Sequence, residues 1–228
     1  MSRLLQGGTA IVTGGGRGIG RAVAAHLCGL GCRVTVFGRN GRDLHAAVAA
    51  GQAALAVVGD VTREADVERL LGEHERALGP LTVLVNNAGL LERALAEEMT
   101  PASFRAQLEV NLTGAFLCAR AAIPGMKARR LGRIVNVASI SGTLGSERAC
   151  AYNASKWGLI GLTKCLAEEL REHGVQCLSV SPGGVDTDML KKTPYPARVG
   201  VEEVARVIGW CAGEAPDAMT GANVEVFG

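Results

Sequence analysis

The sequence predicts an α/β fold, a doubly wound parallel sheet of seven strands with helices on both faces. Two observations predict it. Short apolar runs alternate along the chain with longer segments of helical period, which is typical of repeated βαβ units around a buried parallel sheet. The first apolar run also leads through a glycine-rich turn into a helix. We therefore expect a single α/β domain spanning residues 1–228.

The composition limits the kind of protein this is. The chain has 228 residues, of which 48% are hydrophobic and 20% charged, with a formal net charge of +2. Such a chain can bury a sizeable core, so intrinsic disorder is excluded, and the near balance of charge predicts no nucleic-acid partner. No repeat, low-complexity tract or linker divides the chain, which again favours one domain.

The cysteines indicate a reducing compartment. Their number is odd, they form no C-x-x-C pair, and most lie inside apolar runs, so we expect neither a disulfide framework nor a zinc or other metal site. The first residues lack a basic segment followed by a long apolar stretch, and no run approaches the roughly 18 apolar residues that span a bilayer. We therefore expect a cytoplasmic protein without a membrane partner.

Seven short apolar runs are the strand candidates. Each is rich in β-branched residues and is bounded by polar or glycine-containing segments, as expected for buried parallel strands. In chain order they are Thr9–Thr13, Arg33–Phe37, Ala54–Val58, Thr82–Val85, Arg133–Ala138, Val175–Ser181 and Ala222–Val226.

Segments of helical period lie between these strands. Thr100 is a suitable N-cap before Pro101, which fits the first turn of a helix, and Thr62 precedes Glu64 in a comparable way. The strongest helix candidates are Ile19–Leu30, Glu64–Leu78, Pro101–Met126, Ala151–His173 and Val201–Cys211.

The glycine turn after the first strand predicts a dinucleotide site. Gly14 lets the chain leave the strand abruptly, Gly18 removes a side chain where a pyrophosphate would approach, and Gly20 lets the helix pack closely on the sheet. The free N–H groups and the dipole of the helix that begins near Gly18 would face the anion.

Polar residues follow two further strands at the same expected edge of the sheet. Asn86-Asn-Ala-Gly89 comes after the fourth strand, where the carboxyl end of a parallel strand meets the cofactor crevice, although an Asn pair also suits an ordinary turn. Asp60 follows the third strand. It suits either a turn that leads into a helix or a contact with an adenine amino group.

A Tyr–Lys pair is the strongest sign of catalysis. Tyr152 and Lys156 are four residues apart in a predicted helix, so both side chains project into one site. A phenol is a weak acid near neutrality, and a nearby cation favours its ionised form, so the pair suits a tuned proton donor. Ser139 follows the fifth strand beside the same crevice, where a serine also serves as a cap.

Together these motifs resemble the short-chain dehydrogenase/reductase family over nearly the whole chain, and most closely its 3-oxoacyl-[acyl carrier protein] reductase branch. The matching motifs are Thr13-Gly-x-x-x-Gly18-x-Gly20, Asn86-Asn-Ala-Gly89, Asn111, Ser139, Tyr152-x-x-x-Lys156 and Pro182-Gly-x-Val-x-Thr187. The resemblance implies a Rossmann-type sheet of order 3-2-1-4-5-6-7, and a catalytic tetrad of Asn111, Ser139, Tyr152 and Lys156.

The same resemblance implies a cofactor site and a mechanism. In it Tyr152 protonates the substrate oxygen, Lys156 lowers the phenol pKa and holds the nicotinamide ribose, Ser139 bonds the carbonyl, and Asn111 holds a water that relays protons to Lys156. The implied cofactor-binding residues are Gly14, Arg17, Gly18, Ile19, Gly20, Arg39, Asp60, Val61, Asn87, Ala88, Gly89, Tyr152, Lys156, Pro182, Gly183, Val185 and Thr187.

Two departures from the family pattern affect the substrate end. The segment between Met189 and the helix near Val201 is shorter than is usual in the family, and the chain ends at Val226-Phe-Gly228 without the usual Asp-Gly-Gly after the last strand. The lid and the C-terminal interface therefore follow least directly from the resemblance.

The expected activity is NADP(H)-dependent reduction of a carbonyl, with a small molecule or a 3-oxoacyl thioester as substrate. Gly38 stands where an NAD enzyme places a carboxylate, and Arg39 and Arg17 are expected to flank a 2′-phosphate. Asp43 is expected to lie within the following helix, too far along to replace that carboxylate. The alternatives are an NAD-dependent sugar or steroid alcohol dehydrogenase and a catalytically silent nucleotide sensor.

Two further expectations concern partners. The basic residues Lys127, Arg129, Arg130 and Arg133 resemble a docking site for an acyl carrier protein, although a solvated helix end explains them equally well and His173 weakens the match. Apolar residues cover more than one stripe of the helices Pro101–Met126 and Ala151–His173, which predicts a homo-oligomer, either a dimer or a tetramer.

Overall fold

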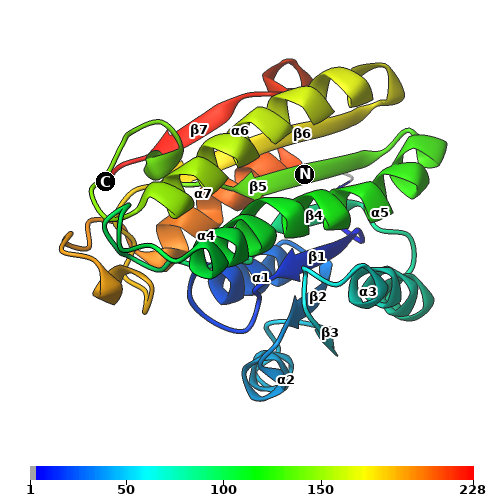
Figure 1. The fold of residues 1–228 in the computed structure, drawn as a ribbon. Coiled ribbons are helices and arrows are strands. Elements are labelled where there is room, and N and C mark those ends of the chain that lie inside the picture. The colour runs from blue at the N-terminus through cyan, green and yellow to red at the C-terminus, as the bar shows by residue number, and fades with distance from the viewer. Residues whose placement is uncertain (1–3) are drawn as a thin grey trace.

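A computed structural model describes residues 4–228 and contains one seven-stranded sheet (Figure 1). The strand order is β3-β2-β1-β4-β5-β6-β7, and every neighbouring pair is parallel. The expected fold class and strand order are therefore confirmed. The order reverses between β1 and β4, which places a crevice at the carboxyl ends of the central strands.

The strands agree with the sequence prediction to within one residue at each end. Buried parallel strands form nearly continuous apolar runs, and such runs are easy to locate in a sequence. The observed bounds are β1 Thr9–Thr13, β2 Arg33–Gly38, β3 Leu55–Val58, β4 Val83–Asn86, β5 Gly132–Val137, β6 Val175–Pro182 and β7 Asn223–Val226.

Helices connect the strands, as expected. The bounds are α1 Gly18–Gly29, α2 Gly41–Ala49, α3 Glu64–Leu78, α4 Pro101–Leu108, α5 Gly114–Arg129, α6 Cys150–Leu170 and α7 Val201–Gly213. The predicted caps are present in part. The Thr100 side chain accepts a hydrogen bond from the Ser103 backbone N–H, whereas α3 is preceded by Arg63 and has no side-chain cap.

The long helix predicted over Pro101–Met126 is interrupted. Its turn at Glu109–Thr113 is π-helical and joins α4 to α5. A π-helical turn inserts one extra residue into a helix and is frequent at functional sites. This turn holds Asn111, which is buried.

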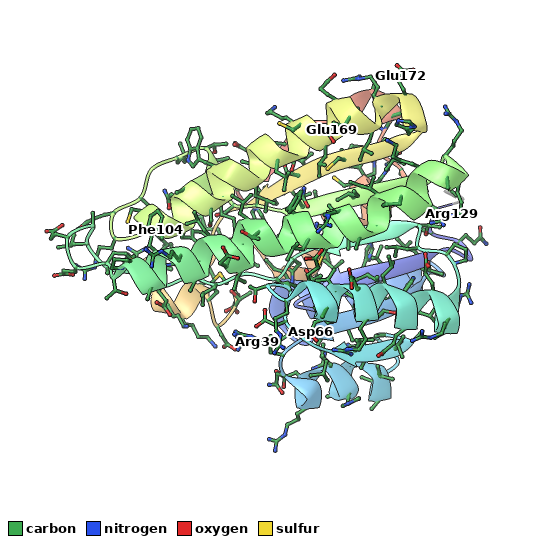
Figure 2. All side chains as sticks on the ribbon, turned by 45° about the vertical axis from the view of Figure 1, so that its right-hand side comes forward. Arg39, Asp66, Phe104, Arg129, Glu169 and Glu172 are labelled. Carbon is green, nitrogen blue, oxygen red and sulfur yellow. The ribbon has the colours of Figure 1, made fainter. Side chains whose placement is uncertain are left out.

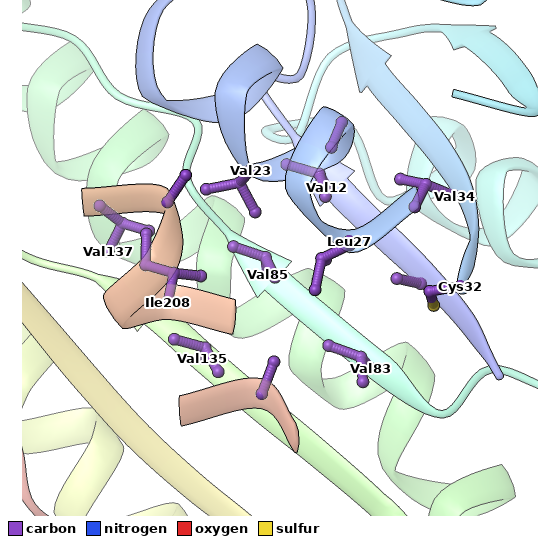
Figure 3. Packing of buried hydrophobic residues seen from close by; sticks show 14 of the residues in the cluster. Val12, Val23, Leu27, Cys32, Val34, Val83, Val85, Val135, Val137 and Ile208 are labelled. Atoms are coloured by element: carbon purple, nitrogen blue, oxygen red, sulfur yellow. The ribbon is translucent and has the colours of Figure 1, made fainter. Parts of the chain in front are cut away.

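The helices cover both faces of the sheet. Helices α1, α2 and α7 pack on one face, over a core that includes Val12, Leu27 and Ile208 (Figure 3). Helices α3, α5 and α6 pack on the other face, over a second core centred on residues such as Leu84 and Ile134. No helix within residues 4–228 is both long and apolar enough to cross a membrane.

Arg133 lies in the interior of the protein. Its predicted place in an exposed basic cluster with Lys127, Arg129 and Arg130 is therefore wrong. Only 2% of Arg133 is exposed, because its strand position points the side chain under α7. Its guanidinium donates 2.9 Å hydrogen bonds to the Cys211 and Ala215 carbonyls and pairs with Asp217 at 3.2 Å. These bonds fix the end of α7 to the sheet.

Candidate active site

One large cavity lies at the carboxyl ends of the strands, with a volume of about 790 Å³. Every predicted cofactor-binding residue lines it, and so do Ser139, Tyr152 and Lys156. The fold therefore gathers side chains that are as far apart in sequence as Gly14 and Thr187. Asn111 alone among the predicted site residues does not line the cavity.

The glycine turn forms one end of this cavity. Gly14 and Gly18 have φ angles of +64° and +52°, a conformation that glycine adopts without strain. A Cβ atom at Gly20 would collide with the Gly14 carbonyl. Helix α1 begins at Gly18 without a side-chain cap on its first N–H groups. The turn thus leaves space and unused donors where a pyrophosphate would fit.

The ends of β1 and β4 are joined by hydrogen bonds. The backbone N–H groups of Asn87 and Ala88 both donate to Thr13 Oγ1 at 3.0 Å, and Asn87 Nδ2 donates to the Thr13 carbonyl at 2.9 Å. Asn86 points instead into the interior, where Nδ2 donates to Asn136 Oδ1 at 2.9 Å. The two asparagines therefore have separate structural tasks, and Asn87 holds the glycine turn in place.

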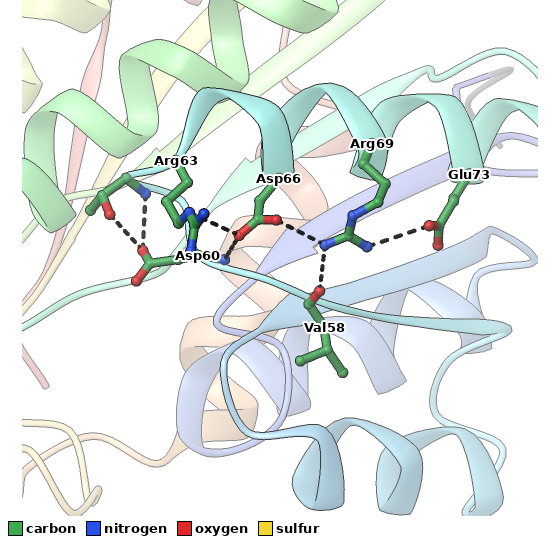
Figure 4. Close-up of polar contacts among 7 residues, drawn as sticks. Val58, Asp60, Arg63, Asp66, Arg69 and Glu73 are labelled. Atoms are coloured by element: carbon green, nitrogen blue, oxygen red, sulfur yellow. Dashed lines mark hydrogen bonds and ion pairs between the residues drawn. The ribbon is translucent and has the colours of Figure 1, made fainter.

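The loop between β3 and α3 is fixed by a polar network (Figure 4). One carboxylate oxygen of Asp60 accepts hydrogen bonds from the backbone and side chain of Thr62. The Asp60 N–H donates to Asp66 Oδ2 at 3.0 Å, a bond that lowers the pKa of Asp66, with a further contribution from Arg69. Arg69 also donates to the Val58 carbonyl at 2.8 Å.

Asp60 therefore serves as a turn residue and lines the cavity at the same time. The supporting roles of Asp66 and Arg69 were not predicted. Their signal in the sequence was the i, i+3 spacing of an acid and a base in the first turns of a helix, which is common on solvated surfaces.

Tyr152 and Ser139 meet at the inner wall of the cavity. Both line it, and the polar side chain of Ser139 favours the ionised phenol. Burial acts more strongly in the opposite direction and raises the pKa of Tyr152 above its ordinary value. Ser139 Oγ also accepts a hydrogen bond from the Ser141 N–H, so the serine caps a short helical turn as well.

Lys156 is buried beside the tyrosine. Its Nζ donates a 2.7 Å hydrogen bond to the Val137 carbonyl, and burial lowers the pKa of the ammonium to about 8. We expected a neighbouring cation to lower the pKa of Tyr152, but the largest effect on this pKa is burial, which raises it. Burial is the largest influence on both groups, and the apolar side chains of Leu91, Ala149 and Met189 pack against Tyr152.

Asn111 acts on the site through the loop that follows β4. Its Oδ1 accepts from the Leu90 N–H at 2.7 Å, and its Nδ2 donates to the Leu90 carbonyl and to Ser155 Oγ, both at 2.9 Å. The amide group is thus engaged by neighbours other than Lys156. Gln107 lies one helical turn earlier and makes similar bonds to the backbone of Glu92, a role that the sequence analysis missed.

Two arginines and an aspartate line the end of the cavity beyond the glycine turn, where the adenosine ribose would lie. Arg39 and Arg17 are both exposed and both line the cavity, and Arg17 also pairs with Asp188 at 3.4 Å. Asp43 lies in α2 as expected, but it lines the cavity and accepts a 2.7 Å hydrogen bond from Asn40 Nδ2. Asp43 thus lies at the edge of the cavity, and the expectation that it is too far along α2 to replace the missing carboxylate stays a prediction. The start of α2 lies against the glycine-rich loop after β1.

Among residues 4–228 there is no group of three or more His, Cys, Asp or Glu side chains arranged to hold a metal ion. The seven cysteines are all free thiols, and four of them are buried.

Comparisons with known proteins identify the family of the chain. The family model described as short chain dehydrogenase matches residues 8–196. The chain is 33% identical to the 3-oxoacyl-[acyl-carrier-protein] reductase FabG of Pseudomonas aeruginosa, over 98% of this chain and 97% of that protein. It is 37% identical to galactitol 2-dehydrogenase of Rhizobium johnstonii, over 97% of this chain and 94% of that protein. The crystal structure of levodione reductase superposes with a TM-score of 0.92 at 26% identity, covering 97% of this chain and 96% of that one.

Proposed function

Because the chain belongs to the short-chain dehydrogenase family, we propose that it is an NADP(H)-dependent enzyme that reduces a carbonyl group to a secondary alcohol. The observation that carries this proposal is the meeting of Tyr152, Ser139 and Lys156 at the inner wall of the cavity. The glycine turn lines the other end of the same cavity, where a dinucleotide would bind, and a Cβ atom at Gly20 would collide with the Gly14 carbonyl and disturb this turn. Both parts would belong to a single domain of residues 1–228, since one sheet supports them.

The proposed roles follow from the geometry of these side chains. When bound, the nicotinamide cofactor supplies the hydride. The Tyr152 hydroxyl donates a proton to the carbonyl oxygen, and Ser139 donates a hydrogen bond to the same oxygen. The Lys156 ammonium stabilises the phenolate that forms. The buried surroundings strengthen each of these interactions, because little water competes with them.

A direct assay tests the proposal. NADPH oxidation is followed with β-keto thioesters, quinones, ketosteroids and sugar ketones as substrates. We expect turnover of at least one class that depends on both substrate and enzyme. If none of these carbonyls is reduced and none of the corresponding alcohols is oxidised, the proposed activity is wrong.

The substrate that we favour is a 3-oxoacyl thioester, because the wall around Tyr152 is apolar and the relatives include a 3-oxoacyl reductase. For a carrier-bound thioester, the docking surface would consist of Lys127, Arg129 and Arg130. Figure 2 shows Arg129 at the end of α5, Glu169 on the neighbouring α6 and Glu172 in the short helical turn that follows α6. Because an acidic partner would meet these carboxylates too, we expect little preference for acetoacetyl carrier protein over the small thioester at low salt.

The second candidate is an NAD-dependent sugar alcohol dehydrogenase. Asp43 favours it, because a carboxylate at the ribose end of the cavity can accept bonds from ribose hydroxyls and repels a 2′-phosphate. The relative that is named galactitol 2-dehydrogenase gives this candidate further support. Preference for NAD and galactitol over NADPH and a keto thioester would establish it.

We also propose that the enzyme is a homo-oligomer that buries the outer surface of α4, α5 and α6. Three large aromatic side chains lie there, with 36% of Phe104, 43% of Phe116 and 54% of Trp157 exposed. Aromatic residues exposed on adjoining helices are typical of a subunit interface. A monomeric mass by light scattering at micromolar concentration would refute this part of the proposal.

A further inference from the structure

Arg93 lies at the substrate end of the cavity, two residues beyond the apolar wall that surrounds Tyr152. That wall consists of Leu91, Ala149 and Met189, which pack with the Tyr152 ring. Arg93 is half-buried and lines the same cavity. A substrate whose carbonyl reaches Tyr152 would therefore extend past Leu91 toward the Arg93 guanidinium.

The Arg93 side chain is held by two other segments. Its Nη2 donates a 2.9 Å hydrogen bond to the Glu147 carbonyl, in the loop that precedes α6. Its Cζ lies 5.7 Å from the centre of the Tyr195 ring, in the loop that precedes α7. Three loops thus fix the guanidinium plane at the edge of the cavity. A fixed guanidinium loses little side-chain entropy when it binds an anion.

The charge of Arg93 is not neutralised within residues 4–228. None of the ion pairs in this part of the chain includes Arg93. By contrast, Arg17 pairs with Asp188, and Arg148, which follows Glu147 in the sequence, pairs with Glu98 at 3.2 Å. One N–H of the guanidinium is used by a neutral carbonyl, and the others are available to a ligand. A carboxylate or a phosphate is the ligand that such a fork binds best.

We propose that the carbonyl substrate carries an anionic group, either a carboxylate or a phosphate, and that Arg93 binds this group. The part of the substrate next to the carbonyl would lie against Leu91 and Met189. This inference rests on the proposed reductase activity. It narrows the substrate class, because sugars and neutral ketosteroids lack such a group.

Matched pairs of substrates test the inference and separate the two anions. Acetoacetyl-coenzyme A is compared with acetoacetyl-N-acetylcysteamine, which has the same acyl group and no phosphate. 5-Oxohexanoate is compared with its methyl ester. In one of these pairs, Arg93→Gln should lower kcat/KM for the charged member by about tenfold or more, as expected for a lost charge-assisted hydrogen bond. The neutral member should change by less than about twofold.

Arg148→Gln is the matched control, because it removes a positive charge from the neighbouring loop without touching the cavity. We expect it to leave both pairs unchanged. Equal losses for charged and neutral members in Arg93→Gln would show that Arg93 only holds the loops, and unchanged values would show that it binds no substrate. Either result overturns the inference.

A binding measurement keeps the inference separate from the proposed activity. Calorimetry with each charged compound should give an affinity for the wild-type protein that falls by about tenfold in Arg93→Gln. If the protein reduces no carbonyl but this difference is present, the proposed function fails and the anion site stands. If the affinities are equal, the anion site fails even when the protein is an active reductase.

Discussion

The ammonium of Lys156 lies 5.6 Å from the centre of the Tyr152 ring, one turn further along α6. Both residues are buried, and Lys156 Nζ is held by the Val137 carbonyl at the end of β5. The sheet thus fixes the position of the cation relative to the phenol. Burial raises the pKa of Tyr152 and lowers that of Lys156, so each group is held closer to its neutral form than in water.

Tyr152→Phe tests the assignment of the proton donor. The substitution removes only the hydroxyl, so the ring still packs against Leu91 and Met189 and the glycine turn is unchanged. We expect turnover to fall by about a hundredfold or more, the usual contribution of general acid catalysis. Fluorescence titration should show that NADPH still binds. Turnover close to that of the wild type with a good substrate would mean that another group donates the proton.

We predict that cofactor preference depends on Arg39. We expect kcat/KM to be higher with NADPH than with NADH, because Gly38 leaves space for a 2′-phosphate and Arg39 lines the cavity beside it. Arg39→Ala should weaken the use of NADPH by about 1.5–3 kcal/mol, the scale of a hydrogen bond between charged groups, and leave NADH nearly unchanged.

Asp43→Asn is expected to change cofactor preference in the opposite direction to Arg39→Ala. Asp43 lies against the glycine turn, since a Cβ atom at Gly16 would be 2.9 Å from the Asp43 Cβ. If its carboxylate repels a 2′-phosphate, the substitution should raise the ratio of kcat/KM for NADPH to that for NADH. Equal values for the two cofactors in the wild type, or a preference for NADH, would overturn the prediction of NADP specificity.

Asp66 is expected to position the adenosine end of the cofactor. Its carboxylate holds the Asp60 N–H, and Asp60 and Val61 line the cavity. Asp66→Asn should therefore raise KM for NADPH with little change in kcat. Reduced nicotinamide mononucleotide lacks the adenosine part, so its use should be unaffected. Glu73→Gln, which alters a neighbouring partner of Arg69, serves as the control. Equal losses with both nucleotides would show a general effect on folding instead.

Much of the fold and part of the site were predictable from local signals. The strands were located because each is a run of buried apolar residues, and Tyr152 and Lys156 because their spacing is one helical turn. Arg133 was misplaced because its neighbours in sequence are exposed bases, while its surroundings are set by Gln176 in β6 and by the end of α7. Asp43 lines the cavity because the start of α2 lies against the glycine turn, and Arg93 because distant loops meet around it. No local pattern marks such residues.

His74 predicts how stability depends on pH. It is fully buried, between Thr35 Oγ1 at 2.8 Å and Thr9 Oγ1 at 3.1 Å. The Thr9 hydroxyl donates to the Pro80 carbonyl, so His74 Nε2 carries the proton and Nδ1 accepts from Thr35. Burial, together with Arg33, lowers the pKa of this neutral imidazole to about 4.

The pKa of His74 is lower in the folded state than the ordinary value of 6.5, so the unfolded chain binds the proton first as the pH falls. The free energy of unfolding should therefore decrease between about pH 6.5 and pH 4, by about 1.4 kcal/mol for each unit of the pKa difference. Urea denaturation at several pH values measures this slope. His74→Gln should lower stability at pH 7.5 and flatten the slope, whereas His45→Gln, on the exposed side of α2, should alter neither. A slope that is the same in His74→Gln as in the wild type would assign the acid sensitivity to other groups.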